Sequence, residues 1–144
     1  MKIELLIKLS RLRFIGKIFR IILILIGLDI PKEVQLGKNV IFEHNGIGTV
    51  IHPHTKIDDN VRIYHNVTVG RADVHLKSSD MKGFHLKQGA ILGAGSKVLN
   101  TKGILTVGEN TIIAANAVLL NSTGDNEIWA GIPARKVGIR KDLL

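Results

Sequence analysis

The feature of this sequence that most restricts its fold is a branched aliphatic residue that returns at every sixth position. The stretch from residue 51 to residue 70 shows it most clearly, with Ile51, Ile57, Ile63 and Val69 in register. An amphipathic helix has a period of 3.6 residues and a half-buried strand a period of two, so neither explains a period of six. The sequence therefore predicts a structure built from repeated six-residue units.

The same period extends over most of the chain and is interrupted at three places. The residues in register are Ile30, Leu36, Phe42, Ile51, Ile57, Ile63, Val69, Leu86, Leu92, Val98, Val107, Ile113 and Leu119. Extra residues follow Phe42, Val69 and Val98, and the insertion after Val69 is the longest. We expect the chain to leave the repeat at these points, and the polar stretch over residues 71–85 to protrude as a loop.

A second small or β-branched side chain recurs four positions after most of these aliphatic residues. Its members are Val34, Val40, Thr55, Val61, Val67, Ala90, Ser96, Thr111 and Ala117. Gly, Asp and Asn cluster between the units, as in Asp58-Asp59-Asn60, where turns need left-handed backbone. Two inward positions in six residues describe a short strand followed by a turn, and three such units close one coil. This pattern is typical of an all-β solenoid, the left-handed parallel β-helix, here with about five coils. We expect the chain after Gly131 to leave the C-terminal end of this solenoid. A β-sandwich would show two-residue alternation instead.

Composition narrows the function classes. The absence of cysteine excludes a disulfide framework, a thiolate metal site and a cysteine nucleophile, and favours a cytoplasmic protein. The formal charge of +8 would suit nucleic acid, an anionic membrane or a phosphorylated ligand. Because basic residues concentrate in a largely aliphatic segment, we expect no nucleic-acid partner.

That segment, residues 1–28, lacks the six-residue repeat. Its charged side chains form two stripes of helical spacing on opposite faces, so we expect two short helices with a break near residues 10–13. The uncharged run over residues 21–28 is too short to cross a bilayer, and no signal-peptidase site follows it. Two compatible interpretations stay open. The segment is an arm that covers one end of the solenoid or packs on a sister subunit, or residues 1–27 lie peripherally on the inner membrane face.

Several motifs resemble those of the hexapeptide-repeat acyltransferases. They are LGAGSKVL at residues 92–99, VGENTIIAANAVLL at residues 107–120 and WAGIPARKVG at residues 129–138. Within that family the chain most resembles serine acetyltransferase, because Asp29-Ile30 precedes Glu43-His44 by the matching spacing and VTVG follows at residues 67–70. The resemblance covers residues 29–138, between the arm and a tail over residues 139–144. It implies an acetyltransferase that uses acetyl-CoA and a homotrimer with active sites between subunits.

Two departures from serine acetyltransferase bear on the acceptor. The long helical N-terminal domain of that family is replaced by residues 1–28, and the second active-site histidine of the family corresponds to Gly83, with His85 nearby as a substitute. Short proteins of this build resemble acetyltransferases of capsule, exopolysaccharide or O-antigen sugars, so we predict a sugar hydroxyl as acceptor. The alternatives are a serine O-acetyltransferase, an amino-sugar N-acetyltransferase, and a non-catalytic trimeric scaffold.

The resemblance and elementary chemistry together suggest the catalytic residues. Acetyl transfer to a hydroxyl needs a base, and histidine, with an ordinary pKa near 6.5, can accept a proton near neutral pH. We predict His44 as that base and Asp29, about one coil earlier, as the carboxylate that fixes its tautomer. The alternatives are an inert loop histidine and a carboxylate that caps the junction between arm and solenoid.

Binding residues follow from position in the predicted coils. For acetyl-CoA, the resemblance points to Ala94, Gly95, Ala115, Asn121 and Arg135. For the acceptor, we predict Glu43, Asn45, Arg71, His75 and Lys82. The histidines of β-helix carbonic anhydrases have a spacing that His52, His54 and His65 lack, so we expect no metal and assign these three to the surface or a subunit interface.

Overall fold

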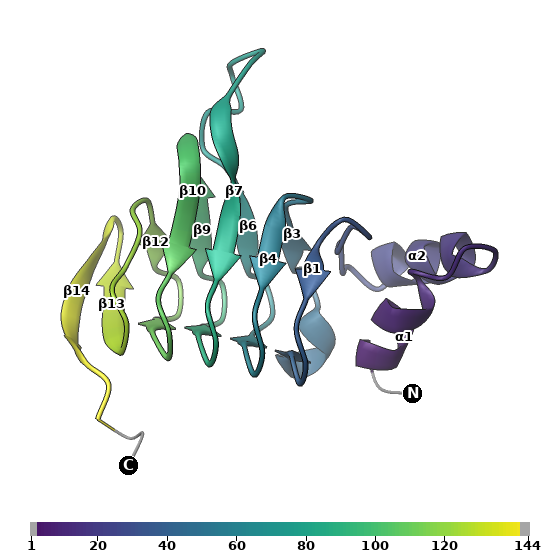
Figure 1. Cartoon of the computed structure of the whole chain (residues 1–144), viewed down its shortest axis with the longest axis horizontal. Helices are drawn as coiled ribbons and strands as arrows, with labels where there is room; N and C mark the ends of the chain where they lie inside the picture. Colours follow the sequence, from purple (N-terminus) through teal and green to yellow (C-terminus); the bar gives the residue numbers. More distant parts are fainter. Residues whose placement is uncertain (1–2, 142–144) are drawn as a thin grey trace.

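The computed structural model describes residues 3–141, and the two ends of the predicted arm and tail lie outside that range. The chain forms an elongated solenoid with two helices at one end, a hairpin at the other and one projection from its side (Figure 1). Almost all of the regular structure after residue 28 is β-strand. The all-β solenoid predicted from the six-residue period is confirmed.

Within residues 3–141 the strands form three sheets, which we call A, B and C, and these are the three sides of the solenoid. Sheet A contains β3 (Val50–Ile51), β6 (Thr68–Arg71), β9 (Lys97–Asn100) and β12 (Val118–Leu119). Sheet B contains β1 (Gln35–Leu36), β4 (Thr55–Ile57), β7 (Asp80–Leu86) and β10 (Lys102–Val107). Sheet C contains β2 (Ile41–Phe42), β5 (Arg62–Ile63), β8 (Ile91–Leu92), β11 (Ile112–Ile113), β13 (Glu127–Gly131) and β14 (Ala134–Ile139). Successive coils stack in parallel, and only the β13–β14 pair is antiparallel among these residues.

The strand register explains the six-residue period. In sheet C, Phe42, Ile63, Leu92 and Ile113 lie directly beside one another from coil to coil, each no more than 3% exposed. Sheets A and B hold equivalent columns, Ile51-Val69-Val98-Leu119 and Leu36-Ile57-Leu86-Val107. Each aliphatic residue therefore contacts its counterpart one coil away, and the three columns merge into one continuous core.

The corners of the solenoid use left-handed backbone, as the Gly, Asp and Asn clusters predict. Asn39, Asn60, Asn110 and Asn126 all have φ between 53° and 59° at the corner from sheet B to sheet C. Their side chains also link the coils, since Asn39 Nδ2 donates to Asn60 Oδ1 at 3.2 Å. Asparagine tolerates this conformation better than most residues, so it marks the tight corners.

The N-terminal arm contains two short helices, α1 (Ile3–Leu9) and α2 (Gly16–Leu25), with the predicted break between them. One face packs on the first coil, where Leu6, Ile7 and Leu23 are buried in the common core. The backbone N–H of Phe42 in β2 donates to Glu4 Oε1 at 3.4 Å. The arm therefore covers the N-terminal end of the solenoid. Neither helix combines the length and hydrophobicity needed to span a membrane.

Two predicted segments differ from the structure. The loop expected over residues 71–85 is shorter, because β7 begins at Asp80 and its second half pairs with β4 inside sheet B. The first half of β7 pairs with an equally extended β10, so the projection in Figure 1 is a two-stranded ribbon that supports a loop over residues 72–79. The chain after Gly131 was expected to leave the solenoid, but β14 folds back on β13 and extends sheet C at the C-terminal end.

Candidate active site

The candidate site lies along the corner where the chain turns from sheet C to sheet A. His44 follows β2, His65 follows β5, Ala94 follows β8 and Ala115 follows β11, so each occupies the same corner of a successive coil. The parallel stacking of the coils makes these residues neighbours although 71 positions separate the first from the last. The side chains at this position of successive coils therefore form a column along the outside of the solenoid.

His44 stands in an irregular turn made by the first insertion in the repeat. His44, Asn45 and Gly46 have φ of 54°, 58° and 61°, which is one turn of left-handed backbone. Such a conformation is unfavourable for non-glycine residues and is held here because Gly46 is buried against Phe42 and Leu28. The turn lifts the exposed ring of His44 toward the next coil, where its centroid lies 5.0 Å from that of His65 and 6.2 Å from that of Tyr64.

A groove of about 510 Å³ runs along the same corner. It is lined by His65, Asn66, Ala94, Gly95, Lys97, Ala115, Asn116, Val118 and Ile132. Three of the five residues predicted to hold acetyl-CoA, Ala94, Gly95 and Ala115, are in this set. The ring contact between His44 and His65 places the predicted base at the end of the groove.

The backbone in the groove suits an extended ligand that carries carbonyl groups. Coil stacking uses the N–H groups of Gly93, Gly95 and Asn116, which donate to the neighbouring coils. Between them, the N–H groups of Ala94 and Ala115 donate to no other residue in the described range. Both alanines line the groove, and unpaired N–H donors there suit the amide carbonyls of a pantetheine arm such as that of acetyl-CoA.

The side chains predicted around His44 have other partners. Asp29 Oδ1 accepts a hydrogen bond from Arg20 Nη2 at 2.8 Å, and no hydrogen bond joins Asp29 to His44 within residues 3–141. Glu43 Oε1 lies 4.0 Å from Arg62 Nη1 across sheet C. Asn45 is exposed in the left-handed turn beside His44. The structure therefore places Glu43 and Asn45 near the base and places Asp29 in a contact that fastens the arm.

The other two predicted acetyl-CoA residues lie outside the groove. Asn121 follows β12 and is exposed at the end of sheet A, one corner away from Ala115. Arg135 is exposed on β14, where its Nη1 donates to the carbonyl of Ala134 at 3.0 Å. Its strand follows Ile132, which does line the groove. The role of Arg135 at the phosphates of the nucleotide stays a prediction.

The other three residues predicted for the acceptor, Arg71, His75 and Lys82, lie at a different corner, between sheets A and B. Arg71 ends β6 and its guanidinium holds the projecting loop, with Nε donating to Asp73 Oδ1 at 2.9 Å and Nη2 to the carbonyl of Leu76 at 3.2 Å. His75 is exposed at the loop, and Lys82 is exposed on β7. Within one chain, then, the loop side chains and His44 occupy separate corners of the solenoid.

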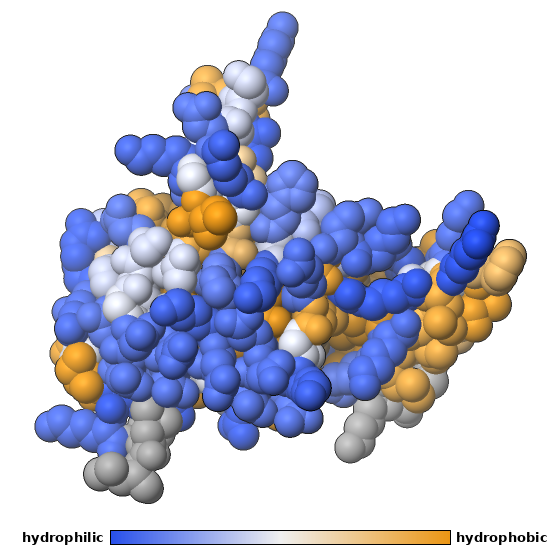
Figure 2. All heavy atoms as spheres, viewed as in Figure 1, coloured by the Kyte–Doolittle hydropathy of each residue, from blue (hydrophilic) through white to orange (hydrophobic). Residues whose placement is uncertain are grey.

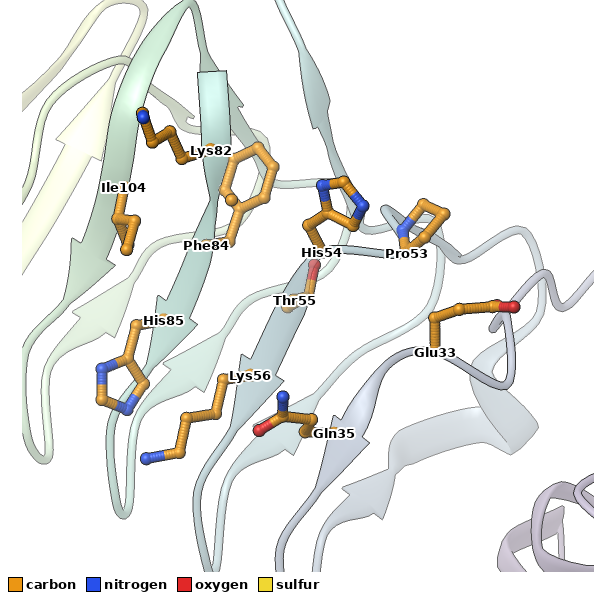
Figure 3. A pocket seen from close by; sticks show the side chains of 11 residues that line it. Glu33, Gln35, Pro53, His54, Thr55, Lys56, Lys82, Phe84, His85 and Ile104 are labelled. Carbon is orange, nitrogen blue, oxygen red and sulfur yellow. The ribbon is translucent and has the colours of Figure 1, made fainter. Parts of the chain in front are cut away.

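A second concavity of about 350 Å³ lies on the face of sheet B and includes Lys82 (Figure 3). His54 and Lys82 stand at one end of it, and His85 and Lys56 at the other. His85 Nε2 lies 2.7 Å from Asp58 Oδ2. Burial disfavours the charged form of Asp58, but hydrogen bonds from His85 and Lys56 outweigh it and hold the pKa of this carboxyl below its ordinary value. His85 therefore pairs with Asp58 and does not occupy the place of Gly83.

Gly83 is where the family's second histidine was expected, and the structure explains why glycine stands there. A Cβ atom at this residue would lie 2.3 Å from the carbonyl oxygen of His54, and φ is 151°. The strands touch at this point, with the N–H of Phe84 donating to that same oxygen at 2.9 Å. His54, rather than His85, is the imidazole-bearing residue in contact with this position.

His52 and His54 form a pair at the corner between sheets A and B. Their ring centroids are 5.3 Å apart, and the ring of His52 also packs on Phe84 at 5.8 Å. Burial, with the neighbouring charges of His54 and Arg71, lowers the pKa of His52. The residues from 3 to 141 contain no group of three His, Cys, Asp or Glu side chains that could hold a metal ion.

Sequence reasoning missed several residues of the groove, and His65 is the most informative. It was predicted to lie at the surface or at a subunit interface, and its Nδ1 is buried and finds no hydrogen-bond partner within the described range. The position of His65 relative to the six-residue repeat could have revealed its place in the groove. Ala94 and Ala115 each stand two positions after an aliphatic residue of the repeat, and His65 stands two positions after Ile63.

Comparisons with known proteins agree with this geometry. No model of a known protein family matches the chain. The serine acetyltransferase of Staphylococcus xylosus is 34% identical over 77% of this chain and 48% of its own length. That of Helicobacter pylori strain J99 is 33% identical over 77% of this chain and 61% of its own. The chain spans between 39% and 61% of the curated relatives that it matches.

Solved structures give the same result. A serine acetyltransferase from Brucella abortus in complex with coenzyme A superposes with a TM-score of 0.67 and 34% identity, over 76% of this chain and 41% of that one. Another from Brucella melitensis covers 96% of this chain and 55% of its own, with a TM-score of 0.77 and 27% identity. The three-sided parallel solenoid, the corner groove and these likenesses together place the chain in the hexapeptide-repeat family of left-handed β-helix acyltransferases, among its serine acetyltransferase-like members.

Proposed function

We propose that this protein is an acetyl-CoA-dependent O-acetyltransferase, with L-serine as the first acceptor to consider. The observation that carries the proposal is the corner groove, in which His44 stands at one end of a column of small residues with unused N–H donors. Identity of 33–35% to several serine acetyltransferases supports the reaction, and the coenzyme A complex of the Brucella abortus enzyme supports the donor.

The chemistry follows from the residues at the groove. His44 takes the proton of the acceptor hydroxyl while the hydroxyl oxygen attacks the carbonyl carbon of the acetyl thioester. The carbon–sulfur bond breaks, and His44 returns the proton to the departing thiolate. A base placed in this way contributes about 10²–10⁴ to a rate. The chain contains no cysteine, which excludes a thiol acyl-enzyme, and the proposed attack is direct.

The proposal includes a homotrimer with the site between subunits. One chain holds the base and the groove at the corner between sheets C and A, but holds the loop over residues 72–79 at the corner between sheets A and B. A neighbouring copy that placed its loop over the first groove would bring His75 and Lys82 toward His44. Three-fold symmetry supplies that arrangement to each site with one kind of interface.

The sugar acceptor predicted from the sequence finds no support among the relatives, whose names give serine. One observation still favours an acceptor other than serine. The close contact between Gly83 and the carbonyl of His54 leaves no room for the family's second histidine in this backbone. A sugar hydroxyl is therefore the second candidate, and the two differ only in what the neighbouring loop must hold.

Release of free coenzyme A thiol tests both candidates. The purified protein is mixed with acetyl-CoA and either L-serine or a panel of monosaccharides and nucleotide sugars, and the thiol is followed with a chromogenic reagent. We expect acceptor-dependent release with serine that falls at least about a hundredfold in His44→Gln. The matched control is His85→Gln, whose histidine pairs with Asp58 away from the groove. If the thiol is released only with a sugar, the sugar replaces serine as the proposed acceptor. If thiol release is unchanged in His44→Gln, His44 is not the base.

A further inference from the structure

Helix α2 carries aliphatic side chains on its solvent-exposed face, where polar or charged side chains are usual. Among its residues, the exposed ones are Lys17, Ile18, Ile21, Ile24 and Leu25, and at helical spacing they share one side. Leu25 is 79% exposed and Phe14, in the turn before the helix, is 88% exposed. The opposite side, which includes Leu23, packs on the solenoid. The arm therefore has one apolar face for its own domain and a second that this chain leaves uncovered.

The fully exposed charged side chains of the described arm are all positive. They are Lys8 on α1, Arg13 in the turn and Lys17 on α2, and none of the three has an ion-pair partner among residues 3–141. Arg13 stacks on the ring of Phe14, with its guanidinium carbon 5.7 Å from the ring centroid. The one acidic side chain of the arm, Glu4, is turned toward the solenoid and accepts from Phe42. In Figure 2, orange side chains cover this end of the molecule and blue ones stand among them.

We propose that this face of the arm, formed by the exposed side chains of residues 12–25, lies on the surface of an anionic phospholipid bilayer. A helix with an aliphatic face and flanking lysine and arginine is the arrangement that rests in the interface of a membrane without crossing it. Phosphate head groups supply the negative charge that the arm lacks, and the acyl boundary covers the aliphatic side chains.

The charge of this face favours an anionic membrane over a second copy of the chain as its partner. Two identical faces in contact would bring Arg13 and Lys17 of both copies together, and no fully exposed side chain among residues 3–28 is a carboxylate that could pair with them. The ion pair between Arg20 and Asp29 and the hydrogen bond from Phe42 to Glu4 also fasten the arm to its own solenoid. The arm can therefore act as a fixed platform that holds the groove close to the membrane.

Flotation with vesicles tests the proposal on the full chain. The probes are vesicles of phosphatidylcholine alone and of phosphatidylcholine mixed with phosphatidylglycerol. We expect the protein to float with the mixed vesicles, to remain behind with the neutral ones, and to be released by high salt. Each basic residue near an anionic surface strengthens partition about fivefold, so Lys8→Gln, Arg13→Gln and Lys17→Gln together should weaken it about a hundredfold.

A matched charge control and an apolar variant complete the experiment. Lys38→Gln, Lys77→Gln and Lys102→Gln remove the same charge from exposed positions outside the arm, and we expect flotation to be retained. Phe14→Ser with Ile18→Ser and Ile21→Ser should weaken partition at least about tenfold. Circular dichroism checks that every variant keeps the wild-type fold. Equal flotation with both vesicle types, no flotation at all, or flotation unchanged in the apolar variant would each overturn the proposal.

Discussion

The imidazole rings of His44 and His65 meet edge to face with their centroids 5.0 Å apart, although the two residues stand on successive coils. His44 is held by a left-handed turn, whereas His65 belongs to a regular corner beside Ile63, which is fully buried. The regular coil thus provides a rigid surface against which the ring of the base rests. This relationship makes His65 a positioning residue for the proposed reaction.

The His65 contact can be tested by exchanging its ring. His65→Phe keeps an aromatic edge and removes the unpartnered Nδ1, so we expect acetyl transfer within about threefold of wild type and no loss of stability. His65→Ala removes the surface on which His44 rests, and we expect kcat to fall at least about tenfold with little change in KM. Steady-state kinetics with both variants is the measurement. An equal loss in His65→Phe and His65→Ala would show that a ring nitrogen, rather than packing, is required.

A substitution at Asp29 tests whether this carboxylate is a catalytic partner of His44 or an anchor of the arm. Its carboxylate accepts from Arg20 and both side chains are partly exposed, so Asp29→Asn should lower the free energy of unfolding by less than about 1 kcal/mol. We expect kcat to change less than about tenfold, because no hydrogen bond joins Asp29 to His44 in the part of the chain described. Chemical denaturation and thiol-release kinetics measure the two effects. A fall in kcat comparable with that of His44→Gln would restore the dyad predicted from the sequence.

The small side chains of the groove can be tested by filling it. Ala115 is exposed at the corner, so Ala115→Leu adds a branched side chain without disturbing the core. We expect binding of coenzyme A to weaken at least about tenfold while the melting temperature stays close to that of wild type. Isothermal titration calorimetry with coenzyme A gives the affinity. The matched control is Leu120→Ala, on an exposed side chain beyond β12, which should leave the affinity unchanged.

Gly83→His would return the histidine that the family has at this position. Because a Cβ there lies 2.3 Å from the carbonyl oxygen of His54, we expect the variant to lose about 1–3 kcal/mol of stability and to gain no activity toward serine. Thermal unfolding and the thiol-release assay check both statements. Lys82→His introduces the same side chain at the exposed neighbouring position and should leave stability nearly unchanged. A stable and more active Gly83→His protein would contradict the geometry described for this strand contact.

His52 makes stability depend on pH in a defined direction. Burial, His54 and Arg71 lower the pKa of His52 in the folded state, so the unfolded chain takes up the proton first as pH falls below the ordinary value near 6.5. Wild-type stability should therefore decrease through that window, and His52→Gln should lose less stability between pH 7 and pH 5 than wild type does. Melting temperatures measured across the range provide the comparison. Parallel curves for the two proteins would exclude His52 as the cause.

The fold could be predicted almost completely because its signal is local and repeated. Ile51, Ile57 and Ile63 lie in three different sheets, yet a single spacing of six places them all in the core. The departures arise where a partner strand decides the outcome. Asp80 belongs to β7 only because β10 is extended beside it, and the chain after Gly131 returns only because β13 offers an open edge. Neither partner is visible from the local sequence.

The site could be predicted only in part, for a similar reason. His44, Ala94 and Ala115 share a corner, and their place relative to the repeat reveals this. The pairing of Asp29 with Arg20 depends on how the arm docks, and the hydrogen bonds of Arg71 depend on the path of the loop. Side chains such as these are polar and partly exposed, and the six-residue spacing says nothing about their partners.

The ribbon formed by β7 and β10 has a consequence for how such proteins diversify. Its two strands come from insertions in neighbouring coils, one after Val69 and a shorter one after Val98, and each gives the other a hydrogen-bonded edge. Grafting the loop over residues 72–79 onto another solenoid would fail unless the three added residues of the following coil were transplanted with it. The proposed acceptor loop is thus a two-part module, whose pieces must be gained or lost together.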